Sequence, residues 1–383
     1  MFNSLINFIQ EQYCTEGPIA LHEPVFNGRE HEYVNETIDS TFVSSVGSFV
    51  NRFEREMETY TCSPKAVVAV NGTAALHTSL ILAGVCPGEL VITQPLTFVA
   101  TCNAIAYCMA EPLFIDVDRL TLSLSPIAVD DWLCEHAELG EDGLCRTRHD
   151  KKVIRACVPM HSFGHPADMD GLLEVCRRWN LALIEDAAES LGSFYKDRHT
   201  GTIGTLGVLS FNGNKIITTG GGGMILAGEK LGARAKHLTT TAKKPHSYEY
   251  VHDELGYNYR LPNLNAALGC AQLEQLESFV SSKRKLASRY NALLKGSNLQ
   301  FVTEPEHCRS NYWLNALICE NRVERDALLK VTNDKGVMTR PIWTLMNNLP
   351  MYANCLRGEL KNAEWLEARV VNLPSSVLPE DLV

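Results

Sequence analysis

A lysine lies between two apolar segments of the sequence and shortly before a run of glycines. Lys215 ends residues 209–215 (LSFNGNK), Gly220 to Gly223 follow, and residues 224–227 (MILA) are apolar again. A lysine beside glycines is usually a solvated loop residue, but apolar sequence on both sides favours burial here. A desolvated lysine has a lowered pKa and can attack an aldehyde to form an imine. We therefore interpret Lys215 as a candidate attachment point for a carbonyl group.

Two acidic residues end another very apolar stretch. Glu185 and Asp186 follow residues 181–184 (LALI), and Glu189 comes shortly after them. A carboxylate in such a place is costly unless it meets a cation or a hydrogen-bond donor. The alternative is a surface loop in which the acids are solvated, and this alternative would be preferred if the segment stood alone.

A polar turn containing glycine precedes an apolar helical pattern at residues 71–76 (NGTAAL). Free N–H groups at the start of a helix, together with the hydroxyl of Thr73, are good ligands for phosphate. Most turns of this kind serve only as helix caps, so this segment by itself is weak support for a phosphate site.

Short apolar runs alternate with longer amphipathic ones over the first two thirds of the chain. Alternation of this kind predicts an α/β fold with a mostly parallel sheet covered by helices on both faces. Ligands of such folds bind at the carboxyl ends of the strands, where the three polar segments lie. We expect strands at residues 66–70, 90–93, 112–116, 153–160 and 181–184, and helices at residues 71–85, at 97–107 and from 168 onward.

The pattern changes after residue 255. We expect one long helix over residues 262–294, then a strand at 312–319 and helices at 322–333 and 365–371. The sequence therefore predicts a large domain at residues 1–255, which includes a short amphipathic helix at the amino terminus, and a smaller C-terminal α+β domain at residues 256–383.

Composition excludes several classes of protein. The chain has 383 residues and a formal charge of −10, which argues against nucleic acid as the main partner. No stretch approaches the ~20 apolar residues of a membrane span, and no secretory signal is recognised. The thirteen cysteines lack metal or redox spacing. We expect reduced thiols, no metal site and a cytoplasmic protein.

Taken together, these segments resemble the DegT/DnrJ/EryC1/StrS family of sugar aminotransferases, a branch of the fold-type I enzymes that use pyridoxal 5′-phosphate (PLP). The resemblance covers nearly the whole chain. It rests on GTAAL, on the EDAA strand end, on S-F-x-x-x-K with its glycine run, and on GYNYR at residues 256–260. Residues 43–47 (VSSVG), 186–193 (DAAESLGS) and 338–343 (MTRPIW) are most similar to the LegC-like branch.

The resemblance implies a fold like that of aspartate aminotransferase and a role for each matching residue. Lys215 would bind PLP and move a proton, and Asp186 would face the pyridine nitrogen. Phe98 would stack on the ring, and Glu189 lies near the phenolic oxygen where many relatives have glutamine. Gly72, Thr73, the Ala74 N–H and Ser210 would hold the phosphate. Asn258 would reach the same phosphate from a second subunit, which implies a homodimer with shared sites.

The implied reaction moves an amino group from L-glutamate to carbon 4 of a nucleotide-linked 4-keto-6-deoxy sugar, through pyridoxamine phosphate. We expect a UDP-N-acetylhexosamine derivative, in the biosynthesis of cell-surface glycans or nonulosonic acids. Substrate contacts would come from Ser45, His161, Tyr259, Arg340 and Trp343. Alternatives are another cyclic ketone, a dTDP- or GDP-linked keto sugar, and a PLP- or sugar-binding regulator without turnover. A lysine at position 215 counts against the relatives that carry histidine there and remove oxygen from sugars.

Overall fold

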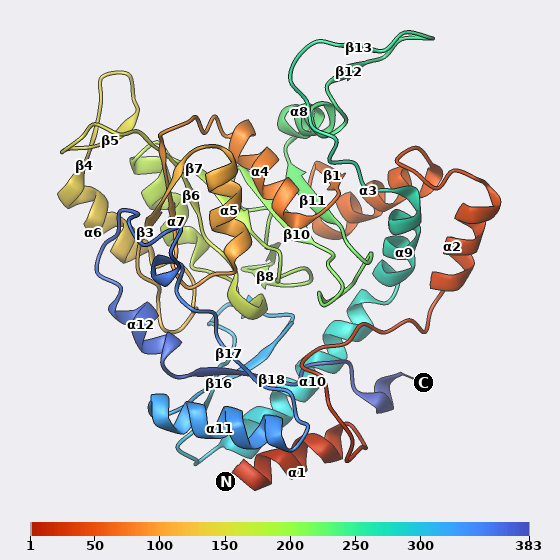
Figure 1. Cartoon of the computed structure of the whole chain (residues 1–383), viewed down its shortest axis with the longest axis vertical. Coiled ribbons are helices and arrows are strands. Elements are labelled where there is room, and N and C mark those ends of the chain that lie inside the picture. Colours follow the sequence, from red (N-terminus) through yellow and green to blue (C-terminus); the bar gives the residue numbers. More distant parts are fainter. Residues whose placement is uncertain (1, 383) are drawn as a thin grey trace.

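A seven-stranded sheet forms the centre of the molecule, in a computed structural model that describes residues 2–382 (Figure 1). The strand order is β1-β11-β10-β7-β6-β2-β3. β11 is antiparallel to β1 and β10, and the other neighbours are parallel. The strands are β1 (Lys65–Ala69), β2 (Leu90–Thr93), β3 (Glu111–Phe114), β6 (Ile154–Val158), β7 (Ala182–Asp186), β10 (Leu206–Ser210) and β11 (Gly223–Ala227).

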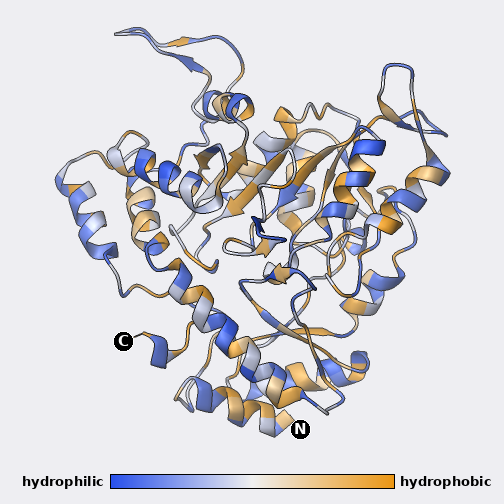
Figure 2. Cartoon of the chain, turned by 180° about the vertical axis from the view of Figure 1, so that it is seen from behind, coloured by the Kyte–Doolittle hydropathy of each residue, from blue (hydrophilic) through white to orange (hydrophobic). Residues whose placement is uncertain are grey.

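Helices cover both faces of this sheet, as predicted. On one face α4 (Gly72–Leu82), α5 (Val99–Tyr107) and α8 (Glu229–Thr239) pack against alternate strand residues such as Val67, Val208 and Ile225. On the other face lie α3 (Ser48–Thr61), α6 (Pro126–His136), α7 (Met169–Arg178) and α9 (Asn263–Leu273). Because both faces are covered, the strands are mostly apolar, and Figure 2 shows hydrophobic residues concentrated along them.

A second, antiparallel sheet lies below the first in Figure 1. Its order is β14-β16-β18-β17, formed by β14 (Gln300–Phe301), β16 (Asn315–Ile318), β18 (Val370–Leu373) and β17 (Arg340–Pro341). α10 (Leu276–Leu294) and α11 (Arg322–Asp334) lie beside it, and α12 (Lys361–Glu367) precedes β18. α1 (Phe2–Gln12) adds Leu5, Ile6 and Ile9 to the apolar cluster of these elements. The amino-terminal helix therefore packs with the C-terminal elements, not with the large sheet. The domain boundary at residue 255 stays a prediction.

The remaining elements are short connections and hairpins. α2 (Glu30–Asp39) packs against α9, and β12 (Lys243–Lys244) and β13 (Val251–His252) form a hairpin that projects from the body in Figure 1. The others are β4 (Ala137–Leu139), β5 (Cys145–Thr147), β8 (Phe194–Tyr195), β9 (Arg198–His199), β15 (Cys308–Arg309), and the 3-10 turns Ser162–Gly164, Met346–Asn348 and Pro379–Asp381.

Two predictions about the C-terminal part were wrong. The long helix predicted at residues 262–294 is two helices, α9 and α10, separated at Glu274 and Gln275. Side chains at this break are held by α2, since Tyr33 donates to Glu274 and Gln275 donates to Glu30. The helix predicted at 365–371 ends at Glu367. Val370 and Val371 instead pair with β16, which suits the preference of β-branched residues for strands.

Two further findings concern the whole of residues 2–382. The thirteen cysteines all lie within residues 2–382, and no disulfide joins them. No helix there has the length and apolar character needed to cross a membrane.

The glycine run positions β11 against the start of α4. A Cβ at Gly223 would lie 2.4 Å from the backbone carbonyl carbon of Asn71, and 2.6 Å from the backbone nitrogen of Gly72. Real side chains do not approach backbone atoms this closely, so only glycine lets the strand and the turn meet here.

We expect Gly223→Ala to lower the free energy of unfolding by about 1–3 kcal/mol, because the added methyl group forces the Asn71 turn away from β11. Gly221→Ala is the matched control, since a Cβ at Gly221 meets nothing within 4 Å. Urea titration of both variants measures the effect. Equal stability of the two variants would show that the close approach is not a constraint.

Candidate active site

The start of α4 lies beside the end of β10 and offers donors for an anion. Asn71 caps the helix by accepting the Ala74 N–H at 2.8 Å. The N–H groups of Gly72 and Thr73 have no acceptor among residues 2–382. A Cβ at Gly72 would lie 3.1 Å from Ser210 Cβ, so the helix start and the strand end approach closely. Free N–H groups at a helix start bind phosphate well. The Ala74 N–H, by contrast, is already used by the cap.

Lys215 and Glu189 face each other within one cavity. The lysine Nζ lies 3.2 Å from Glu189 Oε1 and 4.0 Å from the centre of the Trp313 ring. The other carboxylate oxygen accepts the Phe163 N–H at 2.9 Å. Burial raises the pKa of Glu189 from an ordinary 4.5 to about 7, despite the opposing effect of Lys215. Glu189 can therefore hold or release a proton near neutral pH.

Asp186 ends β7 and points its carboxylate into the same cavity. Thr101 donates to Oδ2 at 2.6 Å and the Ala188 N–H donates to Oδ1 at 3.2 Å. Burial raises the pKa of Asp186, and these two hydrogen bonds oppose the rise. The carboxylate is thus held in a fixed orientation by neutral donors and has no ion-pair partner within residues 2–382.

The cavity that contains these groups has a volume of about 690 Å³. Phe98 is 50% exposed although it lies among buried residues at the start of α5, and its ring forms part of the cavity wall. Predicted residues that line the cavity are Gly72, Thr73, Phe98, Asp186, Glu189, Ser210, Lys215, Arg340 and Trp343.

The residues present fit PLP. A phosphate matches the free N–H groups of α4 and the hydroxyls of Thr73 and Ser210. A half-exposed aromatic ring at Phe98 suits a planar heterocycle, and a carboxylate at Asp186 suits a protonated ring nitrogen. A lysine in a low-dielectric cavity suits an aldehyde. These roles for individual residues stay proposals.

Five predicted residues do not line the cavity of their own chain, and one of them is Ala74, whose N–H donates to the Asn71 cap. His161 is fully buried: its Nδ1 accepts the Ala167 N–H at 3.0 Å, so its Nε2 donates to Glu185 at 3.0 Å. With both ring nitrogens occupied, His161 has no group free for a substrate, and the structure corrects that prediction. Ser45, Asn258 and Tyr259 are also not among the residues that line the cavity.

Sequence reasoning missed two residues of the cavity. Thr101 lies one helical turn after Phe98, on the same face of α5, so helical spacing could have identified it as a neighbour of the site. Trp313 comes from the C-terminal part, and its Nε1 donates to the Asn214 carbonyl at 2.7 Å. No local pattern marks such a residue, because its position depends on how the C-terminal elements pack against the large sheet.

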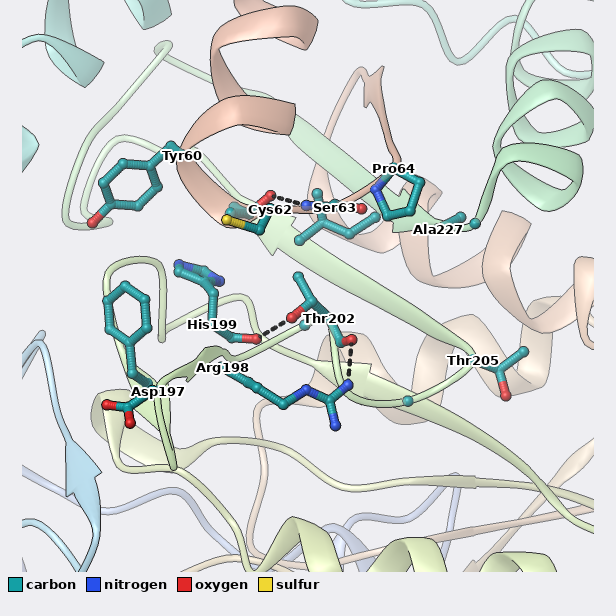
Figure 3. A pocket seen from close by; sticks show the side chains of 16 residues that line it. Tyr60, Cys62, Ser63, Pro64, Asp197, Arg198, His199, Thr202, Thr205 and Ala227 are labelled. Carbon is teal, nitrogen blue, oxygen red and sulfur yellow. Dashed lines mark hydrogen bonds between the residues drawn. The ribbon is translucent and has the colours of Figure 1, made fainter.

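A second cavity, of about 410 Å³, lies beside the start of β1 and β10 and the end of β11 (Figure 3). Its polar groups bond to one another: Thr202 donates to the His199 carbonyl, and Arg198 donates to the Thr202 carbonyl. None of the predicted site residues lines this cavity.

We expect the pH dependence of stability to differ between the cofactor-free protein and its Glu189→Gln variant. The raised pKa means that the folded state keeps a proton on Glu189 that the unfolded state releases above pH 4.5, so stability falls as pH rises from 4.5 to about 7. The variant lacks this dependence. Between about pH 5 and about pH 8 the wild type should lose on the order of 2 to 3 kcal/mol relative to the variant, at ~1.36 kcal/mol per pKa unit. If the free energy of unfolding of the wild type and of the variant changed equally between these two pH values, the raised pKa of Glu189 would be contradicted.

Comparison with known proteins supports the same interpretation of the site. The model of the DegT/DnrJ/EryC1/StrS aminotransferase family matches residues 25–381. A GDP-perosamine synthase of Escherichia coli is 37% identical over 358 residues, 93% of each chain. A putative pyridoxal phosphate-dependent aminotransferase of Bacillus subtilis, EpsN, is 35% identical over 336 residues, 87% of this chain and 84% of the relative.

Among solved structures, the aminotransferase TlmJ of Streptoalloteichus hindustanus superimposes with a TM-score of 0.84 and 28% identity, covering 96% of both chains. The predicted fold class is confirmed by this likeness. With a family match over nearly its whole length and a relative of more than one-third identity, this chain belongs to the DegT/DnrJ/EryC1/StrS aminotransferase family.

Proposed function

We propose that this PLP-dependent sugar aminotransferase moves an amino group from L-glutamate to carbon 4 of a nucleotide-linked 4-keto-6-deoxy sugar in the cytoplasm. The observation that carries the proposal is the meeting of Lys215, Glu189 and Asp186 in one cavity beside the free N–H groups of α4. The family and the relatives named GDP-perosamine synthase support amination of a nucleotide sugar.

Lys215 is the group that binds the cofactor and moves protons. When bound, PLP supplies an electron sink that stabilises negative charge on the substrate carbon beside the amino nitrogen. The lysine Nζ can take the proton from that carbon and return one after the rearrangement of charge. Trp313 and Glu189 hold Nζ in place through a cation–π contact at 4.0 Å and a hydrogen bond at 3.2 Å.

Asp186 and Glu189 have different tasks although both are buried. Thr101 and Ala188 fix the carboxylate of Asp186, which keeps negative charge where a ring nitrogen would be protonated. Glu189, with its pKa near 7, accepts a hydrogen bond from Lys215 and can hold a proton at Oε1. Because their environments differ, Asp186 carries a fixed charge and Glu189 carries a mobile proton.

Two nucleotides, UDP and GDP, are candidates for the nucleotide part of the substrate. Similarity of residues 43–47 and 338–343 to the LegC-like branch favours a UDP-N-acetylhexosamine. The 37% identity to a GDP-perosamine synthase over 93% of both chains favours a GDP-linked sugar. Both candidates keep the same reaction at carbon 4, so the difference lies in the residues that contact the base and the sugar substituents.

We also propose a homodimer in which Asn258 reaches the phosphate site of the partner. Asn258 is exposed and follows the β12–β13 hairpin, which projects away from the rest of the chain (Figure 1). Tyr248, Tyr250 and Leu255, in and after this hairpin, are each at least 80% exposed. Large apolar side chains so far from their own core suit burial against another subunit. A local alternative exists, because Asn258 Oδ1 accepts a hydrogen bond from Arg260 at 3.0 Å.

We expect purified enzyme to lose its PLP absorbance on mixing with glutamate, and to regain it on adding the correct 4-keto-6-deoxy sugar nucleotide. A panel of UDP-, GDP- and dTDP-linked sugars identifies the substrate. Lys215→Ala is the control and should be slower by several orders of magnitude, because it lacks both the attachment point and the proton carrier. A spectrum unchanged by any amino donor would leave only a PLP-binding regulator, and near-normal turnover of Lys215→Ala would exclude the proposed role of the lysine.

Subunit mixing tests the shared site. We expect a purified heterodimer of one Lys215→Ala chain and one Asn258→Ala chain to recover about half of wild-type activity. In an isologous pair that shares its sites, both defects fall in one site and the other site is intact. If Asn258 serves only its own chain, each site keeps one defect. A heterodimer no more active than the better parent enzyme would rule out the shared site.

A further inference from the structure

Two threonine hydroxyls, the hydroxyl pair of Thr97 and Thr101, lead to the carboxylate of Asp186. The Thr101 hydroxyl donates to Asp186 Oδ2 at 2.6 Å, and Thr97 Oγ1 lies 3.0 Å from Thr101 Oγ1. A hydroxyl carries only one proton, and Thr101 gives its proton to the carboxylate. In the contact between the two threonines, Thr97 is therefore the donor. The two hydrogen bonds thus run in one direction, from Thr97 through Thr101 to Asp186.

The hydroxyl pair is shut off from solvent. Thr97, Thr101 and Asp186 are all buried. The Thr97 hydroxyl has one other acceptor within reach, Met160 Sδ at 2.8 Å, but a thioether accepts more weakly than a hydroxyl oxygen. Hydrogen bonds in a low-dielectric interior polarise one another. The bond from Thr97 therefore strengthens the bond that Thr101 makes to Asp186.

The Thr101 side chain behaves differently from other buried threonines in helices. Such threonines can donate to the carbonyl oxygen four residues earlier in the same helix. Five of them do so in this protein at 2.7 to 2.9 Å: Thr37, Thr61, Thr78, Thr239 and Thr332. Thr101 instead bonds to a carboxylate 85 residues away in the sequence, at the end of β7. Its hydroxyl therefore serves Asp186 and not α5.

Asp186 depends on this donor because it is buried without an ion-pair partner among residues 2–382. Burial raises the pKa of Asp186, and of the groups that oppose this rise the Thr101 hydroxyl acts most strongly, ahead of the Ala188 N–H. The charged groups nearby are engaged elsewhere, since Lys215 pairs with Glu189 and His161 pairs with Glu185. The hydroxyl pair is therefore the main support for a negative charge at this position.

We propose that Thr97 and Thr101 are positioning residues that keep Asp186 negatively charged and oriented for the protonated ring nitrogen of PLP. This inference rests on the proposed function, in which Asp186 faces that nitrogen. A charge that is already formed and oriented in the free protein needs no reorganisation when the cofactor binds. Neutral hydroxyls suit this task, because a cation in their place would pair with Asp186 and weaken its attraction for the ring.

The test is titration of the full-length, cofactor-free protein with PLP and, separately, with its 1-deaza analogue, in which carbon replaces the ring nitrogen. Both ligands keep the phosphate and the aldehyde, so their contributions cancel in the comparison. We expect Thr101→Val to weaken PLP binding by about three- to tenfold, and to leave binding of the analogue nearly unchanged. The loss is smaller than the full strength of a hydrogen bond to a charged group, because the variant lacks that bond with and without ligand.

Two more variants separate the hydroxyl from the shape of the side chain. Thr101→Ser keeps the hydroxyl and should bind PLP nearly as the wild type does. Thr97→Val removes the donor to Thr101 and should weaken PLP binding in the same direction but by less, about twofold. Thr239→Val is the matched control, because Thr239 is also buried and its hydroxyl bonds only within α8. It should bind both ligands as the wild type does.

Thermal melting checks that each variant folds, and Thr97→Val carries the comparison of the two ligands if Thr101→Val unfolds. Equal weakening of PLP and of the analogue would reveal a structural role only, and would overturn the proposal. Unchanged PLP binding in Thr101→Val or in Thr97→Val would overturn it too, as would a Thr101→Ser variant that binds PLP no better than Thr101→Val.

Failure of this inference is distinguishable from failure of the proposed function. If glutamate changes the absorbance of the wild-type enzyme but Thr101→Val binds PLP normally, the amino transfer stands and the hydroxyl pair has no role in it. If the loss specific to PLP occurs but no amino donor changes the absorbance of the wild type, the hydroxyl pair stands and the proposed reaction is wrong.

Discussion

Two buried carboxylates beside one lysine are the constraint on which the active site depends. Asp186 and Glu189 are each 3% exposed, and a charge so far from water is tolerated only with donors around it. Asp186 receives the Thr101 hydroxyl and the Ala188 N–H. Glu189 receives the Phe163 N–H and the Lys215 amine, and its pKa still rises to about 7. The same burial thus leaves one acid oriented and the other ready to exchange a proton.

Keeping these donors in place requires contacts between the two parts of the chain. Asn311, from the C-terminal part, donates to the carbonyls of Glu189 and Leu191 at 2.9 and 2.8 Å, and accepts the Trp313 N–H at 2.8 Å. One buried amide therefore fixes the backbone of Glu189 and the residue whose ring contacts Lys215. A displacement of the C-terminal sheet would move both neighbours of the lysine at once.

Local sequence together with the family resemblance predicted the cavity residues that follow strands of the large sheet. Gly72, Thr73, Asp186, Ser210 and Lys215 were found because strand ends in an α/β fold converge and each polar residue there interrupts an apolar run. Residues held by tertiary contacts had no such signal. Trp313 looks like an ordinary member of the strand predicted at residues 312–319, and the break at Glu274 contains neither proline nor glycine. His161 follows a strand as Asp186 does, but it turns toward Glu185 instead of the cavity.

The pair formed by His161 and Glu185 shows why position after a strand does not define a site residue. Glu185 neighbours Asp186 in sequence, so the alternation of a strand sends their side chains to opposite faces. On its own face Glu185 accepts the N–H groups of Gly201, Ile203 and Gly204 at 2.6 to 2.7 Å, as well as the His161 ring. These bonds fix the loop that enters β10, the strand that ends at Ser210. The two neighbouring acids therefore have different roles: Asp186 faces the cavity, and Glu185 anchors the strand that ends at Ser210 and leads to Lys215.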